Sequence, residues 1–249
     1  MMQTCLVHRL GVIEYEAAWR MQTELADQVA KQQRPPTLLL LEHPHTYTFG
    51  RSGHAENLLW DEAELSRRQV KVLWVDRGGD VTYHGPGQLV GYPLLPLAPG
   101  GLRPSGGSSR IPQADYVGHV RRLEQTLILA LSWLGVPAFQ MDGMTGVWVK
   151  HPGVHVKHPQ PLSSGSQPAK IAAIGVKVDV QGVSRHGFAL NVGPDMRYWE
   201  GIVGCGLVGY PVTSLAELLT SPPTMEAVIQ AVLGAFAQIY HYRLAEEVL

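Results

Sequence analysis

The residue best suited to covalent chemistry is Cys205, which lies in the segment Val203-Gly204-Cys205-Gly206-Leu207. Flanking glycines leave a cysteine side chain accessible and leave backbone N–H groups free to bind an anion. A thiolate nucleophile with an oxyanion hole needs both. The commoner role of a cysteine is that of a small buried apolar side chain. We assign that role to Cys5, which has no such neighbours.

Lys170 is the candidate group for ionising Cys205. A free thiol has a pKa of about 8.5, and a neighbouring cation lowers that pKa. Lys170 opens the apolar run 170–177, which is typical of a strand. A lysine at a strand end is more often simply solvated, and by composition Lys150 and Lys177 are alternative cations.

A glycine-rich stretch, RGGDVTYHGPGQLVGY at 77–92, is the third feature that could do chemistry. Glycines let a backbone approach a ligand closely and adopt positive φ, while the side chains between them supply shape and hydrogen bonds. The stretch is too polar for a core strand, so we predict the floor of a binding site that leads into a strand at 89–95. The alternative is an ordered turn between two strands. The order of a phosphate-binding loop, G-x-x-x-x-G-K-[ST], is absent.

The histidines do not form a recognisable metal motif. His43 and His45 lie close together, and His151, His155 and His158 share one segment. Zinc needs three or four converging ligands, and neither H-E-x-x-H nor C-x-x-C occurs. We therefore predict no metal and no other cofactor. The absence of G-x-S-x-G argues against a serine hydrolase.

The composition excludes several classes of protein. The 249 residues are 45% hydrophobic, which is enough for a substantial core. Lys and Arg total 20 and Asp and Glu total 21, so binding of nucleic acid through bulk charge is not expected. No apolar run could span a bilayer, and the N-terminus lacks the layout of a signal peptide. Two cysteines do not indicate a secreted, disulfide-rich domain, so we expect a cytoplasmic protein with free thiols and no membrane partner.

The elements that must position these residues follow no regular β-α-β rhythm. Apolar spacing and capping residues predict helices at 15–31, 61–68, 116–134 and 225–240, and a short helix capped by Ser214. Strands are predicted at 5–10, as an edge, and at 37–42, 70–76, 89–95, 146–150, 170–180 and 187–191. Segments 43–53, 98–110 and 151–168 are predicted loops. We expect one α+β domain, 1–249, with a mixed β-sheet core flanked by helices, although residues 215–249 could pack as a small unit of their own.

Five segments occur in an order that resembles a known family. They are LEHPHTYTFGR (41–51), RGGDVTYHGPGQ (77–88), KIAAIG (170–175), HGFALNV (186–192), and GCG followed by VTSL (204–215). Together they resemble the octanoyltransferases of lipoate synthesis, which belong to the biotin/lipoate protein ligase superfamily. The resemblance runs from about residue 8 to residue 220. It implies an α+β fold like that of biotin and lipoate ligases.

The resemblance also implies an activity. Such an acyltransferase moves an octanoyl group from acyl carrier protein to a lysine of a lipoyl domain through a cysteine thioester, as the first step of endogenous lipoate biosynthesis. The acceptors would be the lipoyl domains of 2-oxoacid dehydrogenases and the glycine cleavage carrier protein. The family's nucleophile falls on Cys205, and the lysine that lowers its pKa falls on Lys170. The acyl-binding residues fall on Arg77, Gly78, Gly79, Asp80, Val81, Thr82, Tyr83 and His84, on Ala173, Ile174 and Gly175, and on Gly187, Phe188 and Ala189.

This chain departs from the family's pattern in three places. Ala169 stands where arginine usually precedes the lysine, Gly204 stands where proline usually precedes the cysteine, and 151–168 resembles an insertion. None of these changes removes a proposed catalytic group.

Two other functions remain compatible with the sequence. An ATP-dependent lipoate or biotin ligase of the same superfamily would not need Cys205. A non-catalytic module would bind lipoyl domains or acylated carriers without ever carrying the acyl group itself.

Overall fold

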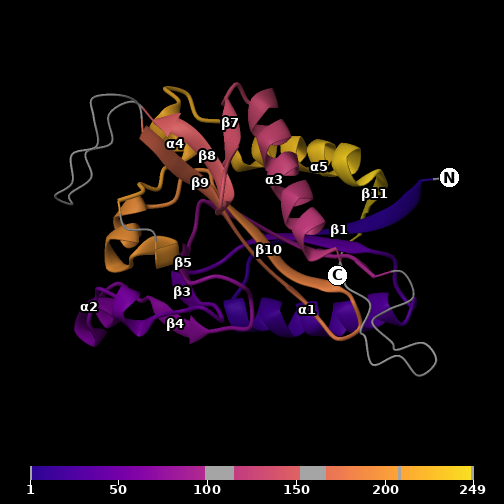
Figure 1. Cartoon of the computed structure of the whole chain (residues 1–249), viewed down its shortest axis with the longest axis horizontal. Coiled ribbons are helices and arrows are strands. Elements are labelled where there is room, and N and C mark those ends of the chain that lie inside the picture. The colour runs from indigo at the N-terminus through magenta and orange to yellow at the C-terminus, as the bar shows by residue number, and fades with distance from the viewer. Residues whose placement is uncertain (1, 99–114, 152–166, 207–208, 248–249) are drawn as a thin grey trace.

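Two β-sheets form the framework of the protein (Figure 1). The computed structural model describes residues 2–98, 115–151, 167–206 and 209–247. The large sheet contains β1 (Gln3–Val12), β2 (Thr37–Glu42), β6 (Gln88–Leu94), β7 (Ala138–Met141), β8 (Met144–His151), β9 (Gln167–Val178), β10 (Ser184–Asn191) and β11 (Tyr242–Glu246). The small sheet contains β3 (Thr46–Phe49), β4 (Lys71–Trp74) and β5 (Val81–His84).

The large sheet is mixed, as predicted. Its strand order is β11-β1-β2-β6-β10-β9-β8-β7. β1 pairs in parallel with both β2 and β11, whereas the other neighbouring strands are antiparallel. The small sheet has the order β4-β3-β5.

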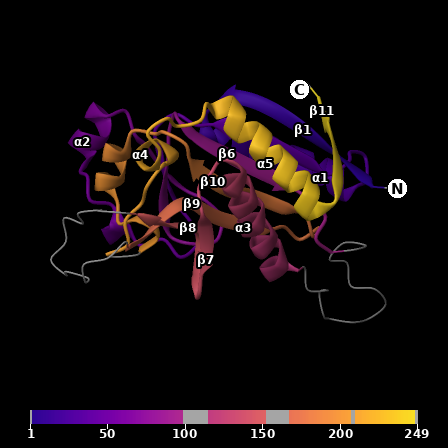
Figure 2. The same ribbon diagram turned by 90° about the horizontal axis from the view of Figure 1, so that it is seen from above.

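Helices cover both faces of the large sheet (Figures 1 and 2). α3 (Tyr116–Trp133) and α5 (Met225–Tyr240) lie together on one face, and α1 (Tyr15–Ala30) lies on the other. The short helices are α2 (Glu62–Arg67) and α4 (Leu215–Leu218). No helix in the described ranges is both long and apolar enough to cross a membrane.

The leucines of β2 explain the three-layer arrangement. Successive side chains of a strand point to opposite faces. Leu38 and Leu40 belong to the core that includes α3 and α5, whereas Leu39 and Leu41 belong to the core that includes α1. A strand that is apolar on both faces must be covered on both, which confirms the prediction for 37–42.

The predicted helix boundaries are supported by capping bonds. The side chain of Asp115 accepts a hydrogen bond from the N–H of Gly118, and that of Ser214 accepts one from Glu217. Thr224 caps α5 in the same way. Gly135 follows the end of α3 with φ +78°, a conformation that glycine adopts at little cost.

Three sequence-based predictions of secondary structure are wrong. The predicted loop 43–53 contains β3, and the stretch 77–92, which we judged too polar for a core strand, contains β5. β1 is not an edge strand, because β11 pairs along its outer side. β11 also ties residues 242–246, after α5, into the large sheet. β7 was not predicted.

Burial of polar side chains accounts for the missed strands β3 and β5. All four residues of each strand are buried. Their polar groups find partners across the small sheet: the Oγ1 of Thr48 lies 3.3 Å from the Nε2 of His84 and accepts a hydrogen bond from Arg77. Such partners satisfy polar groups away from water, but they come from distant parts of the chain. The predicted loops 98–110 and 151–168 lie almost entirely outside the described residues.

Candidate active site

A cavity of about 220 Å³ lies between the two sheets, on the α1 side of the large sheet. The large sheet contributes residues of β6, β9 and β10, and the small sheet contributes β5 and the segment before it. The cavity is lined by Tyr15, Arg77, Gly78, Gly79, Asp80, Thr82, His84, Tyr92, Gly143, Met144, Thr145, Lys170, Ala173, Ile174, Gly175, His186, Gly187, Phe188 and Ala189.

β9 and β10 bring two of the predicted acyl-binding segments side by side. In their antiparallel register Ala173 pairs with Ala189, Ile174 with Phe188 and Gly175 with Gly187. All six residues line the cavity. Glycine at 175 permits the close approach of Arg77 and Gly78, because a Cβ there would lie 3.0 Å from the side chain of Arg77 and from the carbonyl oxygen of Gly78 and would have to push them away. The third predicted segment therefore packs directly onto this strand pair.

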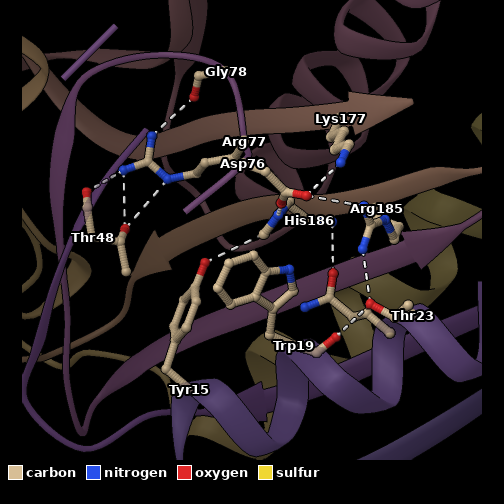
Figure 3. Close-up of polar contacts among 11 residues, drawn as sticks. Tyr15, Trp19, Thr23, Thr48, Asp76, Arg77, Gly78, Lys177, Arg185 and His186 are labelled. Carbon is tan, nitrogen blue, oxygen red and sulfur yellow. Dashed lines mark hydrogen bonds and ion pairs between the residues drawn. The ribbon is translucent and has the colours of Figure 1, made fainter. Parts of the chain in front are cut away.

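Arg77 anchors that third segment. Its guanidinium donates to the Oγ1 of Thr48 from Nε (3.3 Å) and Nη2 (3.0 Å), to the carbonyl of Thr48, and to the carbonyl of Gly78 at 2.9 Å (Figure 3). The N–H of Gly78 donates to the carbonyl of Val176 at 3.0 Å. These bonds join the loop to β3 on one side and to β9 on the other.

β5 divides the remaining predicted residues between two faces. Thr82 and His84 line the cavity, whereas Val81 and Tyr83 pack in a separate core with Tyr47 and Phe49. The strand period of two causes this alternation. Among the residues that we predicted to bind the acyl group, the structure thus places Val81 and Tyr83 behind the wall of the cavity rather than on it. The hydroxyl of Thr82 is buried without a hydrogen-bond partner.

Asp80 connects the cavity with the segment that carries Cys205. Its carboxylate accepts hydrogen bonds from the backbone N–H groups of His54 (3.1 Å) and Val81 (2.7 Å) and from the side chain of Asn57. A Cβ on Gly206 would lie only 2.8 Å from the Oδ2 of Asp80. The single turn Gly204–Gly206 therefore packs against the Asp80 end of the cavity.

The turn around Cys205 differs from our expectation in one respect. We expected both flanking glycines to leave their N–H groups free, but the N–H of Gly206 donates to the carbonyl of Val203 at 3.0 Å. Gly206 has φ +65°, which favours glycine at this position. The side chain of Cys205 lies outside the described part of the structure.

Lys170 lines the same cavity and is only 5% exposed. Its backbone N–H donates to the carbonyl of Pro211 at 2.8 Å, and its carbonyl accepts from Thr213 at 2.9 Å. The chain downstream of Cys205 is thereby hydrogen-bonded to β9 at Lys170. The Nζ lies 4.8 Å from the centre of the Trp148 ring, a cation–π contact. Among the described residues, no carboxylate forms an ion pair with Lys170.

The two alternative lysines have other roles. Lys177 pairs with Asp76, and Lys150 is exposed on β8. Neither lines the cavity. The structure therefore favours Lys170 as the cation of the site.

Sequence reasoning missed several residues of the cavity. Tyr15 is the first residue of α1, Tyr92 lies on β6 and His186 lies on β10. The segment 143–145, which joins β7 to β8, contributes a further part of the wall. His186 stood inside a family motif, and its φ of +58° is uncommon for a non-glycine residue. Tyr92 ends the glycine-rich stretch 77–92 but was not among the predicted site residues, and Tyr15 carried no local signal.

His43, His84 and Tyr15, at the buried end of the cavity, are neutral near pH 7. Burial lowers the pKa of His43 to about 4 and holds the pKa of His84 well below its usual value. Burial also raises the pKa of Tyr15 to about 12. His43 accepts or donates on both ring nitrogens, at 2.7 Å to the carbonyl of Ile13 and at 2.7 Å to the hydroxyl of Tyr92. The charge at this end comes from the guanidinium of Arg77, which lines the cavity. It offsets part of the rise that burial causes in the pKa of Tyr15, and it lowers the pKa of His84 further below its usual value.

No cluster suited to a metal ion occurs among the described residues. His43 is bound to Tyr92, and His45 stacks on Tyr198 with ring centres 3.9 Å apart. His155 and His158 lie outside the described residues, as does the side chain of His151.

A cavity with an apolar wall and a few convergent polar groups, such as Lys170 and Arg77, is typical of a site for a small ligand. Comparison with known proteins identifies the class more closely. The model of the lipoyl protein ligase A/B catalytic domain matches residues 14–237, and the chain belongs to this family.

Curated relatives match over nearly the whole chain. A protein of Chloroflexus aggregans named octanoyltransferase is 41% identical over 242 residues, which cover 97% of each chain. An octanoyltransferase of Koribacter versatilis is 39% identical and covers 94% of this chain and 83% of its own.

Solved structures show the same fold. The bipartite lipoate protein ligase of Thermoplasma acidophilum has a TM-score of 0.66 at 16% identity, and covers 100% of this chain and 88% of its own. A lipoate-protein ligase A bound with ATP has a TM-score of 0.63 at 16% identity, and the match covers 100% of this chain and 90% of its own. The expected likeness to lipoate ligases is confirmed at the level of the fold.

Proposed function

We propose that the protein is an octanoyltransferase that moves an octanoyl group from acyl carrier protein to a lysine of a lipoyl domain. The observation that carries the proposal is the meeting of three separated segments, 77–84, 173–175 and 187–189, around one cavity that also contains Lys170. The relatives named octanoyltransferase, near 40% identity, support the same reaction. Cys5 is a buried free thiol, which suits a reducing cytoplasm.

In this proposal Cys205 is the nucleophile. Its thiolate sulfur attacks the carbonyl carbon of the donor thioester, a new carbon–sulfur bond forms, and the thiolate of the carrier protein leaves. Lys170 favours the ionised thiol, because an opposite charge nearby stabilises a thiolate. The ring of Trp148 contacts the Lys170 ammonium but carries no opposite charge that would neutralise it.

The second step releases the product. The neutral amine of the acceptor lysine attacks the Cys205 thioester, an amide bond forms, and the Cys205 thiolate leaves. The amine proton passes to Lys170, directly or through a water, after the Lys170 ammonium has given its own proton to the departing thiolate of the carrier protein. Each step exchanges one acyl bond for another, so no ATP is consumed. The acceptors would be the lipoyl domains of 2-oxoacid dehydrogenases and the glycine cleavage carrier protein.

The cavity suits the acyl tail. Its wall includes Ala173, Ile174, Phe188 and Ala189, and burial of about seven carbon groups would contribute on the order of 5–6 kcal/mol. The hydroxyl of Thr82 has no partner in the described part of the chain and is available to the carbonyl end of the acyl group.

The deciding experiment is intact-mass analysis after the protein is mixed with octanoyl carrier protein, without ATP and without acceptor. We expect a gain of one octanoyl group that is lost on treatment with neutral hydroxylamine and is absent in Cys205→Ala. An unchanged mass with an intact donor would contradict the proposal. It would favour an ATP-dependent ligase if octanoate and ATP then modify a lipoyl domain, and a binding module if they do not.

A further inference from the structure

One wall of the cavity is exposed and one end is buried. Gly79, Gly143 and Thr145 belong to the exposed wall. Tyr15 and His186 at the buried end are 2% and 1% exposed, and His84 and Tyr92 beside them are also buried. Along β9, Ala173, Ile174 and Gly175 lie between Lys170 and Val176, the partner of His186. In the proposed reaction the carbonyl end of the acyl group lies near Lys170, so its tail would extend along this wall toward Tyr15 and His186.

A chain of hydrogen bonds closes the buried end (Figure 3). The hydroxyl of Tyr15 lies 3.3 Å from the Nδ1 of His186, and the Nε2 of His186 lies 2.7 Å from the Oδ1 of Asp76. Asp76 is held in turn by Lys177 and by the Nη2 of Arg185 at 3.0 Å.

The backbone of His186 is fixed as well. Its N–H donates to the Oε1 of Gln22 on α1 at 2.7 Å. The rings of Tyr15, His43 and His84 pack against one another. The ring centre of Tyr15 lies 4.8 Å from that of His43 and 5.5 Å from that of His84, and the two histidine centres are 5.5 Å apart. This end of the cavity is thus a wall made by α1 and β10 that has little freedom to move.

We infer that Tyr15 and His186 form the end wall of the acyl pocket and set the upper limit of acyl-chain length, an inference that rests on the proposed octanoyl transfer. A longer chain must displace the Tyr15 ring. Its displacement breaks the bond to His186 and leaves buried polar groups unpaired, which is unfavourable. A shorter chain leaves part of the apolar wall unfilled and gains less from burial.

The test is a competition between octanoyl and dodecanoyl carrier protein, with the acyl-enzyme read by intact mass. We expect Tyr15→Ala to raise the ratio of dodecanoyl to octanoyl enzyme at least tenfold over wild type. Tyr15→Phe, which keeps the ring and loses the hydroxyl, should raise it by less. The ratio within one sample does not depend on the fraction folded, and Tyr15→Leu serves if Tyr15→Ala does not fold.

A matched control exists on the other face of the large sheet. Tyr240 on α5 also lies within hydrogen-bonding distance of a histidine, with its hydroxyl 3.1 Å from the Nδ1 of His119. Tyr240→Ala should keep the wild-type ratio. A wild-type ratio in both Tyr15→Ala and Tyr15→Leu would overturn the inference while the octanoyl transfer stands. Failure of the wild type to take up octanoyl would overturn both.

Discussion

At the scale of single residues, the structure separates Lys170 from Lys150 and Lys177, the two other lysines considered as the cation of the site. It is buried in the cavity, and its ammonium faces the ring of Trp148 rather than a carboxylate. A buried cation that is not neutralised by an acid exerts a strong field in its surroundings, because little water screens it. Such a group favours the ionised form of a nearby thiol.

Lys170→Met should therefore slow formation of the acyl-enzyme by at least 100-fold at pH 7, since methionine keeps much of the volume and loses the charge. Raising the pH should recover part of the rate, because hydroxide then ionises the thiol. The pH–rate profile of single-turnover acylation measures both effects. Lys150→Met, an exposed control on β8, should behave as wild type. An equal rate loss at every pH would indicate misfolding rather than loss of the cation.

At the scale of elements, an irregularity in β8 positions Lys170. The pairing of β8 with β9 shifts register between Val147 and Trp148. Gly146, just before the shift, has φ +123°, and its N–H donates to the Oε1 of the buried Glu124 on α3 at 3.0 Å. A bulge of this kind re-aims neighbouring side chains. Helix α3 thus fixes the part of β8 that contacts the lysine.

Gly146→Ala should destabilise the protein and disturb Lys170. A Cβ at Gly146 would lie 2.7 Å from the carbonyl oxygen of Ala172 and 3.3 Å from the Cε of Lys170. We expect the free energy of unfolding to fall by about 2–4 kcal/mol, from backbone strain together with overpacking. Urea denaturation measures this loss.

Gly135→Ala is the control for strain alone. Gly135 also has positive φ, but a Cβ there would meet nothing within 4 Å. Its substitution should cost only about 1 kcal/mol and leave acylation unchanged. Equal losses in the two variants would contradict the crowding predicted at Gly146.

At the scale of the whole molecule, several buried histidines and tyrosines lie between the two sheets, around the cavity. His43, His84 and His186 are buried, and their pKa values are lowered by burial. They are neutral in the folded protein, whereas the unfolded chain protonates its histidines near pH 6.5. The stability that depends on their neutral forms is therefore present above about pH 6.5 and is lost as the pH falls below it, for His43 toward a folded pKa of about 4.

His43→Gln should reduce this dependence on pH. The folded pKa of His43 is about 4, so at pH 5 the wild type loses about 2 kcal/mol through this group alone. The change in unfolding free energy between pH 7.5 and pH 5, measured with urea, should be smaller by about that amount in His43→Gln. The exposed control His54→Gln should follow wild type. Parallel losses in wild type and His43→Gln would show that His43 does not carry the effect.

Local patterns in the sequence determined much of the framework. The leucine run of β2 and the cap at Asp115 followed from periodicity and capping, because these features depend on neighbours in the chain. Family motifs led to the segments that line the cavity, and to Cys205 and Lys170 as predicted catalytic residues. Periodicity alone did not separate Lys170 from its two alternatives.

Only the tertiary structure decided which side chains of the segments 77–84, 173–175 and 187–189 face the cavity. It alone also showed which residues close the buried end of the cavity. The polar strands β3 and β5 are stable because Thr48, Arg77 and His84 satisfy one another between the sheets. The wall at Tyr15 and His186 joins residues 171 positions apart. Contacts between residues so far apart in the chain produce no repeating pattern in the local sequence. The burial and pairing of these polar groups depend on partners that only the folded chain brings together.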